Sequence, residues 1–378
     1  MKVMSIFGTR PEAIKMAPLL VNLEKNPRIN SIVCVTGQHR EMLDQVLDLF
    51  EITPDYDLNV MKKNQSLSEV TSRIITNLSS IIEEVKPDLI LVHGDTTTTF
   101  SAALSGFYHQ VSVGHVEAGL RTGNIFSPWP EEANRKLVSC VTEMHFAPTK
   151  QAMINLKQEN IDESKIIVTG NTVIDALVMI KEKIESDTDL QNSLIQNFPF
   201  IQEGKRIVLV TGHRRENFGQ GFENICESLK SLANKNKDVN FVYPVHLNPR
   251  VREPVNQLLS NVGNIHLIEP QGYLEFVFLM INSYIILTDS GGIQEEAPAL
   301  GKPVIVMRDT TERPEAVSAG TVVLVGTDKN KIIETIDVLL NNESKYKKMS
   351  MSHNPYGDGT ASQKIIQRII DELGGMND

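Results

Sequence analysis

The sequence is poor in the features that mark membrane proteins, nucleic-acid-binding proteins and disulfide-rich proteins. It has no run of about 18 apolar residues and no N-terminal apolar stretch with a cleavage site, so neither a membrane span nor a secretory signal is predicted. Lys and Arg number 37 against 47 Asp and Glu, and the formal net charge of -10 disfavours nucleic-acid binding. The three cysteines, Cys34, Cys140 and Cys226, are far apart and form no disulfide framework or Cys-x-x-Cys zinc site. A cytoplasmic protein is therefore expected.

What is present fits a globular protein with two α/β domains. The chain has 378 residues, of which 41% are hydrophobic, and this length is too great for one ordinary core. Strand-like apolar runs alternate with amphipathic segments, a pattern typical of parallel sheets with crossover helices. The runs lie at residues 31–37, 88–94, 111–117, 206–212, 240–246, 284–292 and 303–307. Residues 362–373 have apolar positions at helical spacing and predict a final helix.

One internal similarity suggests that each half begins with its own first strand. "KVMSIFGTRPE" (2–12) aligns without gaps to residues 206–216, which pairs Gly8 with Gly212, Arg10 with Arg214 and Glu12 with Glu216. Chance similarity between two apolar strands is the alternative, because a strand followed by a glycine turn is common in α/β proteins. We place the boundary near residue 170, where "IIVTGN" ends a strand and a helix begins.

The stretch "SIFGTRPEAIK" (5–15) has the form of a strand, a glycine turn and a helix, which often binds phosphate. The G-x-G-x-x-G loop of dinucleotide sites is absent, and Arg10 stands two residues after Gly8. The turn therefore predicts an anion site that carries a cation instead of further glycines.

The loop "TDSGGIQEEA" (288–297) is a second candidate phosphate site. Gly291 and Gly292 would let a diphosphate approach the backbone, and the hydroxyl of Ser290 would add a donor. A tight turn without ligand is the alternative. Glu296 would either stabilise the start of the helix or accept the two hydroxyls of a ribose.

Carboxylates gather at or just after predicted strand ends in the first half, at Asp95, Glu117 and Glu131. Strand ends of open α/β sheets face the ligand cleft, so these groups are candidates for acid–base chemistry. Arg135 lies four residues after Glu131, and an exposed ion pair between the two is the simpler interpretation. His213 follows the second glycine turn and would bind phosphate or titrate near neutrality. No cluster has metal-ligand spacing, so no metal is predicted.

Nine motifs in order resemble the bacterial non-hydrolysing UDP-N-acetylglucosamine 2-epimerases over nearly the whole chain. They are "FGTRPEAIK", "GDTTTT", "HVEAGLRT", "PEEANRK", "GNTVIDAL", "TGHRREN", "TDSGGIQEEAPALGKPV", "TERPEA" and "NPYGDG". The resemblance implies two Rossmann-like domains with a deep interdomain cleft, a GT-B-like fold, and a C-terminal helix that returns to the N-terminal domain. The implied domains are 1–170 plus 362–378, with the sugar site and catalytic carboxylates, and 171–361, which binds UDP.

The resemblance also implies reversible epimerisation at carbon 2 of UDP-GlcNAc to UDP-ManNAc, without NAD or metal, in support of cell-surface polysaccharide synthesis. UDP would leave first to give 2-acetamidoglucal and would then add back. The implied partners are UDP-GlcNAc, UDP-ManNAc, UDP and a second copy of the chain in a homodimer.

Matching the motifs residue by residue carries the family's sites onto this sequence. The nucleotide positions are Arg10, Gln271, Phe276, Ser290, Gly291, Gly292, Glu296 and Arg313. The sugar-binding and catalytic positions are Lys15, Asp95, Glu117, Glu131, Arg135 and His213. A second, activating UDP-GlcNAc would bind at Gln38, His39, Arg214 and His246, and the alternative for Gln38 and His39 is a polar loop cap without ligand.

Three other functions stay open on the sequence. A GT-B glycosyltransferase would share the fold and the UDP site but needs an acceptor site. A hydrolysing epimerase would release ManNAc and UDP. A catalytically silent nucleotide-sugar sensor would not need the carboxylates at Asp95, Glu117 and Glu131.

Overall fold

The computed structural model describes residues 1–37, 40–62 and 65–374, and these form two compact units. The first unit comprises Met1–Ala176 and Tyr356–Asp378, and the second comprises Leu177–Pro355. Helix α7 (Thr172–Ser186) contains the first boundary between them. Among the described residues, no helix has both the length and the apolar character needed to cross a membrane.

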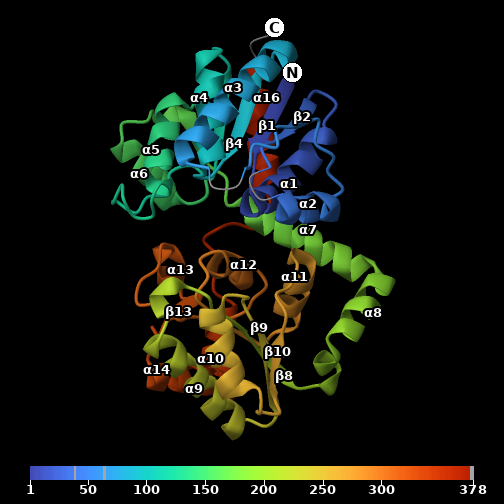
Figure 1. The fold of residues 1–378 in the computed structure, drawn as a ribbon, viewed down its shortest axis with the longest axis vertical. Coiled ribbons are helices and arrows are strands. Elements are labelled where there is room, and N and C mark those ends of the chain that lie inside the picture. The colour runs from blue at the N-terminus through green and yellow to red at the C-terminus, as the bar shows by residue number, and fades with distance from the viewer. Residues whose placement is uncertain (38–39, 63–64, 375–378) are drawn as a thin grey trace. The chain divides into compact units, whose positions relative to one another are not determined.

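The first unit is built on a seven-stranded parallel sheet in the order β3-β2-β1-β4-β5-β6-β7. Figure 1 shows its strands β1, β2 and β4 among the helices of the unit. Its strands are β1 (Lys2–Phe7), β2 (Asn30–Val35), β3 (Tyr56–Asp57), β4 (Leu89–His93), β5 (Ser112–Val116), β6 (Met144–Ala147) and β7 (Ile166–Val168). Its helices are α1 (Arg10–Glu24), α2 (Arg40–Leu49), α3 (Leu67–Val85), α4 (Thr97–Tyr108), α5 (Glu131–Val141), α6 (Lys150–Gln158), the 3-10 turn η1 (Glu163–Lys165) and α16 (Ala361–Gly374).

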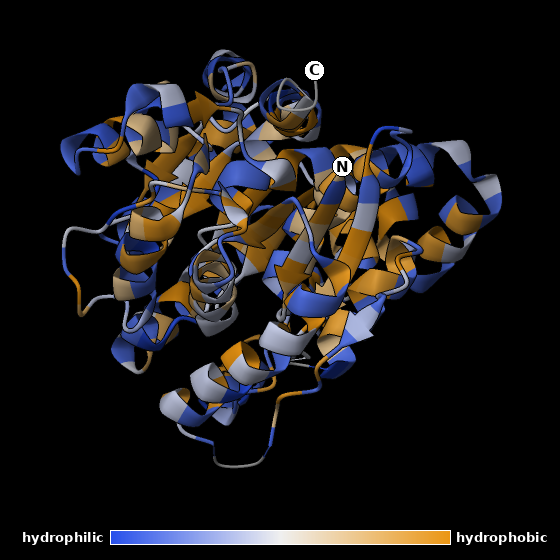
Figure 2. Cartoon of the chain, turned by 90° about the horizontal axis from the view of Figure 1, so that it is seen from above, coloured by the Kyte–Doolittle hydropathy of each residue, from blue (hydrophilic) through white to orange (hydrophobic). Residues whose placement is uncertain are grey.

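The strands form because they are apolar on both faces, as a sheet covered by helices requires. All five residues of β4 are buried, and most of the strand arrows in Figure 2 are orange. Helix α3 begins with a capping box in which Ser66 and Glu69 satisfy each other's main-chain N–H groups, and its apolar stripe joins the core. Helix α16 packs against α1, so the end of the chain completes the first unit.

The second unit has a six-stranded parallel sheet in the order β10-β9-β8-β11-β12-β13. Its strands are β8 (Arg206–Thr211), β9 (Val239–Pro244), β10 (Ile265–Ile268), β11 (Ile285–Thr288), β12 (Val304–Val306) and β13 (Val322–Leu324). Its helices are α8 (Thr188–Asn197), η2 (Pro199–Glu203), η3 (Arg215–Asn217), α9 (Gln220–Lys235), α10 (Pro249–Leu259), α11 (Tyr273–Asn282), α12 (Ile293–Ala299), α13 (Pro314–Ala319), α14 (Lys329–Asn341) and α15 (Glu343–Ser350).

The two sheets confirm the predicted fold class of two Rossmann-like, GT-B-like domains, and β1 and β8 hold matching places in them. Each is the first strand of its sheet in sequence and lies between the second and a later strand, where the strand order reverses. Glu12 and Glu216, which the internal sequence alignment matches, make different contacts. Glu12 is buried and bonds its own glycine turn, whereas Glu216 is half-exposed and pairs with Arg308.

Candidate active site

Glu12 fixes the turn between β1 and α1. Its Oε2 atom accepts hydrogen bonds from the main-chain N–H groups of Gly8 (3.0 Å) and Thr9 (2.8 Å) and from the Thr9 hydroxyl (2.8 Å). A Cβ atom at Gly8 would lie 2.0 Å from Oγ1 of Thr36, so this position requires glycine. Arg10, the predicted anion ligand, is the first residue of α1 and is half-buried.

The same carboxylate joins this turn to the loop that carries Asp95. Oε1 of Glu12 accepts hydrogen bonds from the hydroxyls of Thr96 (2.6 Å) and Thr99 (3.1 Å), on either side of the start of α4. Burial raises the pKa of Glu12, although its hydrogen bonds act in the opposite direction. Glu12 therefore holds two strand-end loops of the first unit together.

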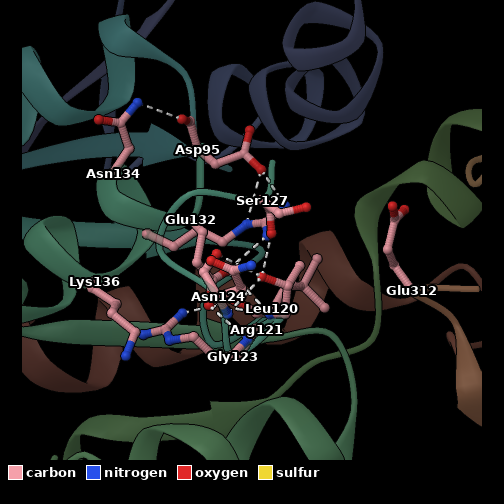
Figure 3. Close-up of polar contacts among 12 residues, drawn as sticks. Asp95, Leu120, Arg121, Gly123, Asn124, Ser127, Glu132, Asn134, Lys136 and Glu312 are labelled. Atoms are coloured by element: carbon pink, nitrogen blue, oxygen red, sulfur yellow. Dashed lines mark hydrogen bonds and ion pairs between the residues drawn. The ribbon is translucent and has the colours of Figure 1, made fainter. Parts of the chain in front are cut away.

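Asp95 lies directly beyond β4, as predicted, and is paired with Arg135 of α5. Oδ2 of Asp95 accepts from Nη2 (2.6 Å) and Nε (2.9 Å) of Arg135. Figure 3 shows the side chain of Asn134 directed at the main-chain oxygen of Asp95, to which it donates at 2.8 Å. Two successive residues of α5, Asn134 and Arg135, thus bind the Asp95 loop.

The ion pairs of Arg135 correct the simple interpretation of an exposed pair with Glu131. Arg135 pairs with Asp95 and, at 3.0 Å, with Glu132, and its side chain is only 15% exposed. Glu132 is fully buried and also accepts from the main-chain N–H groups of Thr122 and Gly123, which fixes the loop in Figure 3. Within the described part of the chain, Oε2 of Glu131 is buried without a hydrogen-bond partner.

Glu117 and Lys15, which the family resemblance assigns to the sugar site, lie next to each other. Nζ of Lys15 forms an ion pair with Oε2 of Glu117, and the side-chain amide of Asn171 donates to the same oxygen at 2.7 Å. Glu117 adopts the left-handed backbone conformation, with φ of 64°, which is uncommon for a residue with a side chain. The carboxylate directly after β5 is thus held at a defined position.

Three histidines are buried in the sheet beneath these loops. His93 ends β4, while His115 of β5 and His145 of β6 are direct cross-strand neighbours. Burial lowers the pKa of His93 and of His115 to about 4 and that of His145 to about 3. All three are therefore neutral near pH 7 and contribute no charge to the site.

In the second unit, His213 lies just beyond β8 and His246 lies just beyond β9. Their rings stack with centroids 5.2 Å apart and an interplanar angle of 12°. Nδ1 of His213 is 3.7 Å from Oδ1 of the fully buried Asp289, which follows β11. Partial burial lowers the pKa of His213, and the Asp289 charge opposes this shift.

The predicted nucleotide loop connects β11 to α12. Ser290 donates its main-chain N–H to Oγ1 of Thr288 at 2.9 Å, and Gly292 is the N-cap residue of α12. Oε1 of Glu296 accepts from the hydroxyl of Tyr273 at 2.8 Å. A Cβ atom on Gly291 would lie 3.9 Å from Nη2 of Arg214, which places the Arg214 side chain beside this loop.

The remaining predicted positions lie around the same sheet. Gln271 precedes α11 and donates to the carbonyl of Glu269 at 2.6 Å, and Phe276 is in α11. Arg313 precedes α13 and forms an ion pair with the buried carboxylate of Glu295. Gln38 and His39 lie outside the described residues.

Four carboxylate or amide residues of these networks were not singled out from the sequence for a role. They are Glu12, Glu132, Asn171 and Asp289. Asn171 and Asp289 stand inside quoted motifs, "GNTVIDAL" and "TDSGG", so polar residues beside motif glycines are the signal to look for. Across the described ranges 1–37, 40–62 and 65–374, no group of three or more His, Cys, Asp or Glu side chains forms a metal site.

Comparison with known proteins places the chain in a family. A family model described as UDP-N-acetylglucosamine 2-epimerase matches residues 21–370. The UDP-N-acetylglucosamine 2-epimerase of Escherichia coli strain K12 is 59% identical over 369 residues, which cover 98% of each chain. The crystal structure of UDP-GlcNAc 2-epimerase from Neisseria meningitidis bound to UDP-GlcNAc is 58% identical, with a TM-score of 0.90 over 98% of this chain and 100% of that one. The Methanocaldococcus jannaschii enzyme in complex with UDP-GlcNAc and UDP is 34% identical, with a TM-score of 0.78 over 98% and 99% of the two chains. This chain belongs to the UDP-N-acetylglucosamine 2-epimerase family.

Proposed function

We propose that the chain catalyses the reversible interconversion of UDP-GlcNAc and UDP-ManNAc at carbon 2 of the sugar. The observation that supports the proposal is that the chain belongs, over nearly its full length, to a family whose members are named for this activity. The paired, partly buried carboxylates at the strand ends of the first unit give independent support. They are the groups that an elimination and re-addition would use.

The chemistry explains why carboxylates are needed. The proton on carbon 2 is barely acidic, so direct removal would require a very strong base. Loss of UDP from carbon 1 creates an oxocarbenium-like state in which that proton becomes labile, and a carboxylate then removes it to give 2-acetamidoglucal. A proton delivered to the opposite face and re-addition of UDP complete the epimerisation.

In this proposal, Asp95, Glu117 and Glu131 are the acid–base and charge-stabilising groups. Asp95 forms an ion pair with Arg135, and Glu117 forms one with Lys15. Glu131 differs, because its buried Oε2 has no hydrogen-bond partner among the described residues. That environment suits a carboxyl group that exchanges its proton with a substrate.

The leaving diphosphate needs donors and positive charge. We assign this role to Arg10 of the first unit and to His213, the Ser290–Gly292 loop and Arg313 of the second. Glu296 would accept hydrogen bonds from the nucleoside, and Gln271 would donate hydrogen bonds to it. Phe276 would pack against the base. Release of UDP before re-addition would end the reaction as an elimination, with 2-acetamidoglucal and UDP as products, so tight retention of UDP is part of the proposal.

Regulation, assembly and location extend the proposal. We place an activating second UDP-GlcNAc at Arg214, His246 and the undescribed Gln38 and His39. We expect a homodimer in the cytoplasm. The exposed aromatic side chains of Phe107 and Tyr108, at the end of α4, offer apolar area for such an interface.

Incubation of the purified protein with UDP-GlcNAc alone in deuterated water tests the proposed activity. Proton NMR should show UDP-ManNAc with deuterium at carbon 2 and no accumulation of free sugar. Release of ManNAc and UDP would instead indicate a hydrolysing epimerase. Conversion only after an acceptor is added would indicate a glycosyltransferase, and no turnover would favour a sensor.

A further inference from the structure

Asp289 is a fully buried carboxylate whose two oxygens have different surroundings. Oδ2 accepts hydrogen bonds from the main-chain N–H groups of His213 and Arg214, both at 2.8 Å, and from the amide of Asn217 at 3.4 Å. Oδ1 is equally buried and has no hydrogen-bond partner among the described residues. A buried carboxylate oxygen without a partner is costly, so a role for Oδ1 is expected.

The imidazole of His213 is a basic group close to Oδ1, with its Nδ1 atom 3.7 Å away. The ring of His213 is held on one side by the parallel ring of His246. Nδ1 of His246 accepts a main-chain hydrogen bond from Asn248 at 3.1 Å, which fixes that ring in turn. A small rotation of His213 within this stack would bring Nδ1 into hydrogen-bond distance of Oδ1.

We propose that Asp289 is a positioning residue that holds His213 in the Nδ1–H tautomer and presents its Nε2 atom to the substrate. The inference rests on the proposed function, in which His213 stabilises the departing diphosphate. One carboxylate would then hold both the main chain and the ring of His213. A carboxylate behind a histidine fixes the tautomer and stabilises the imidazolium. Nε2 of the neutral Nδ1–H tautomer is an acceptor, so the ring donates from Nε2 to a phosphate oxygen once Nε2 has taken up a proton.

A purely structural role would not need the second oxygen. The two main-chain N–H groups at 213 and 214 require a single acceptor, and Oδ2 supplies it. A neutral asparagine at 289 would satisfy both N–H groups equally well through its carbonyl oxygen. The asparagine NH₂ group would then take the place of Oδ1, because two N–H donors cannot face another donor.

The charged and titratable groups around His213 have opposing effects on its protonation. Asp289 favours the imidazolium, whereas His246 from the end of β9 and Arg214 beside it disfavour that form. The phenol of Tyr243 in β9 donates to the carbonyl of Gly212 at 3.0 Å and closes the other side of the turn. Removal of the Asp289 charge leaves only groups that oppose protonation, so the pKa of His213 should fall further.

The test is an NMR measurement of the His213 ring in the full-length protein, with Asp289→Asn as the variant. The ring resonances are assigned by their loss in His213→Asn, and nitrogen shifts at a pH where the ring is neutral report the tautomer. We expect Nδ1 to carry the proton in the unaltered protein and Nε2 to carry it in Asp289→Asn. At a pH above the pKa of His213 in the unaltered protein, the imidazolium fraction should fall by about tenfold or more in the variant.

Asp189→Asn, at an exposed position of α8, is the matched control and should change neither the tautomer nor the pKa. An unprotonated Nδ1 in the unaltered protein, or the same His213 pKa with and without Asp289, would overturn the inference. The tautomer of the unaltered protein decides the question even if Asp289→Asn fails to fold. The measurement needs no turnover, so its outcome is separate from that of the epimerisation assay. In the assay, kcat should fall about 100-fold in Asp289→Asn with a smaller change in KM.

Discussion

The side-chain amide of Asn171 donates a 2.7 Å hydrogen bond to the carboxylate of Glu117, and its main-chain N–H donates to the carbonyl oxygen of Tyr356 at 2.7 Å. Gly170, in the left-handed conformation with φ of 91°, lies against the same returning segment, and a Cβ atom there would be 3.2 Å from that carbonyl. The segment that begins at Tyr356 therefore supports the position of Glu117, a residue far from it in sequence.

Asn171→Ala should lower kcat by about tenfold while the protein stays folded, because Glu117 keeps its ion pair with Lys15 but loses an aligning donor. Steady-state kinetics with UDP-GlcNAc measure the change. Asn256→Ala, on the exposed side of α10, is the control and should keep normal rates. Normal kcat in Asn171→Ala would show that Lys15 alone positions the carboxylate.

Asp95→Asn, Glu117→Gln and Glu131→Gln should each lower turnover by at least about 100-fold, the effect of removing a general acid or base. UDP affinity should change little, because these groups are assigned to the sugar. Coupled turnover assays and UDP calorimetry measure the two effects. Glu83→Gln, which alters a side chain that is 71% exposed, is the matched control. Near-normal rates in all three variants would refute the assignment of the carboxylates.

The sequence predicted the central strands well because a strand buried on both faces is a continuous apolar run. The runs at 88–94 and 206–212 correspond to β4 and β8, and the predicted final helix at 362–373 corresponds to α16. Strands β3, β6, β10 and β13, with two to four residues each, were not predicted. Segments this short carry no periodic signal and depend on pairing with a neighbouring strand.

The partners of the charged side chains could not be predicted, because local spacing was the only guide. Spacing suggested Glu131 as the partner of Arg135, whereas the structure pairs Arg135 with Asp95, 40 residues earlier. Asn171 meets Glu117 across 54 residues and Asp289 meets the His213 turn across 76. Such contacts follow from the register of the parallel strands, which brings their carboxyl ends together, and that register is not visible in a single sequence.

Arg10→Ala and Ser290→Ala should each weaken UDP binding, by about tenfold for the arginine and less for the serine, since a charged donor contributes more to phosphate binding than a hydroxyl. The reason for choosing these residues is that each follows a central strand of its sheet, β1 for Arg10 and β11 for Ser290. Isothermal calorimetry with UDP measures the dissociation constants. Arg28→Ala, at an exposed position, is the control for lost charge. Unchanged constants in both variants would contradict the assignment of these two residues to the nucleotide site.

Pure UDP-ManNAc should turn over only after a lag, and a trace of UDP-GlcNAc should abolish the lag. The reason is that an activator that binds one conformational state better shifts the population toward it. Arg214→Ala should prolong the lag and make it insensitive to added UDP-GlcNAc. Time courses with UDP-ManNAc freed of its epimer provide the measurement. Immediate, linear conversion would rule out activation by a second ligand and leave the catalytic assignment untouched.

The raised pKa of Glu12 predicts a pH-dependent effect on stability. A carboxyl group whose pKa is higher in the folded state than in the unfolded state favours folding most below its unfolded value, near 4.5. That contribution is lost as the pH rises through the folded value, because the folded protein must then bury the charge. Glu12→Gln removes this titration. Its amide supplies a carbonyl oxygen for the N–H groups of Gly8 and Thr9, and an NH₂ group that the hydroxyls of Thr96 and Thr99 are able to accept.

The free energy of unfolding of Glu12→Gln, relative to the unaltered protein, should therefore increase between pH 4.5 and pH 8, by about 1.4 kcal/mol for each unit by which the folded pKa is raised. Urea unfolding at several pH values measures this difference. Glu12→Ala should be less stable at every pH, by about 3 kcal/mol, because it leaves the buried N–H groups of the turn without an acceptor. A constant difference between the glutamine variant and the unaltered protein would show that Glu12 titrates alike in the folded and unfolded states.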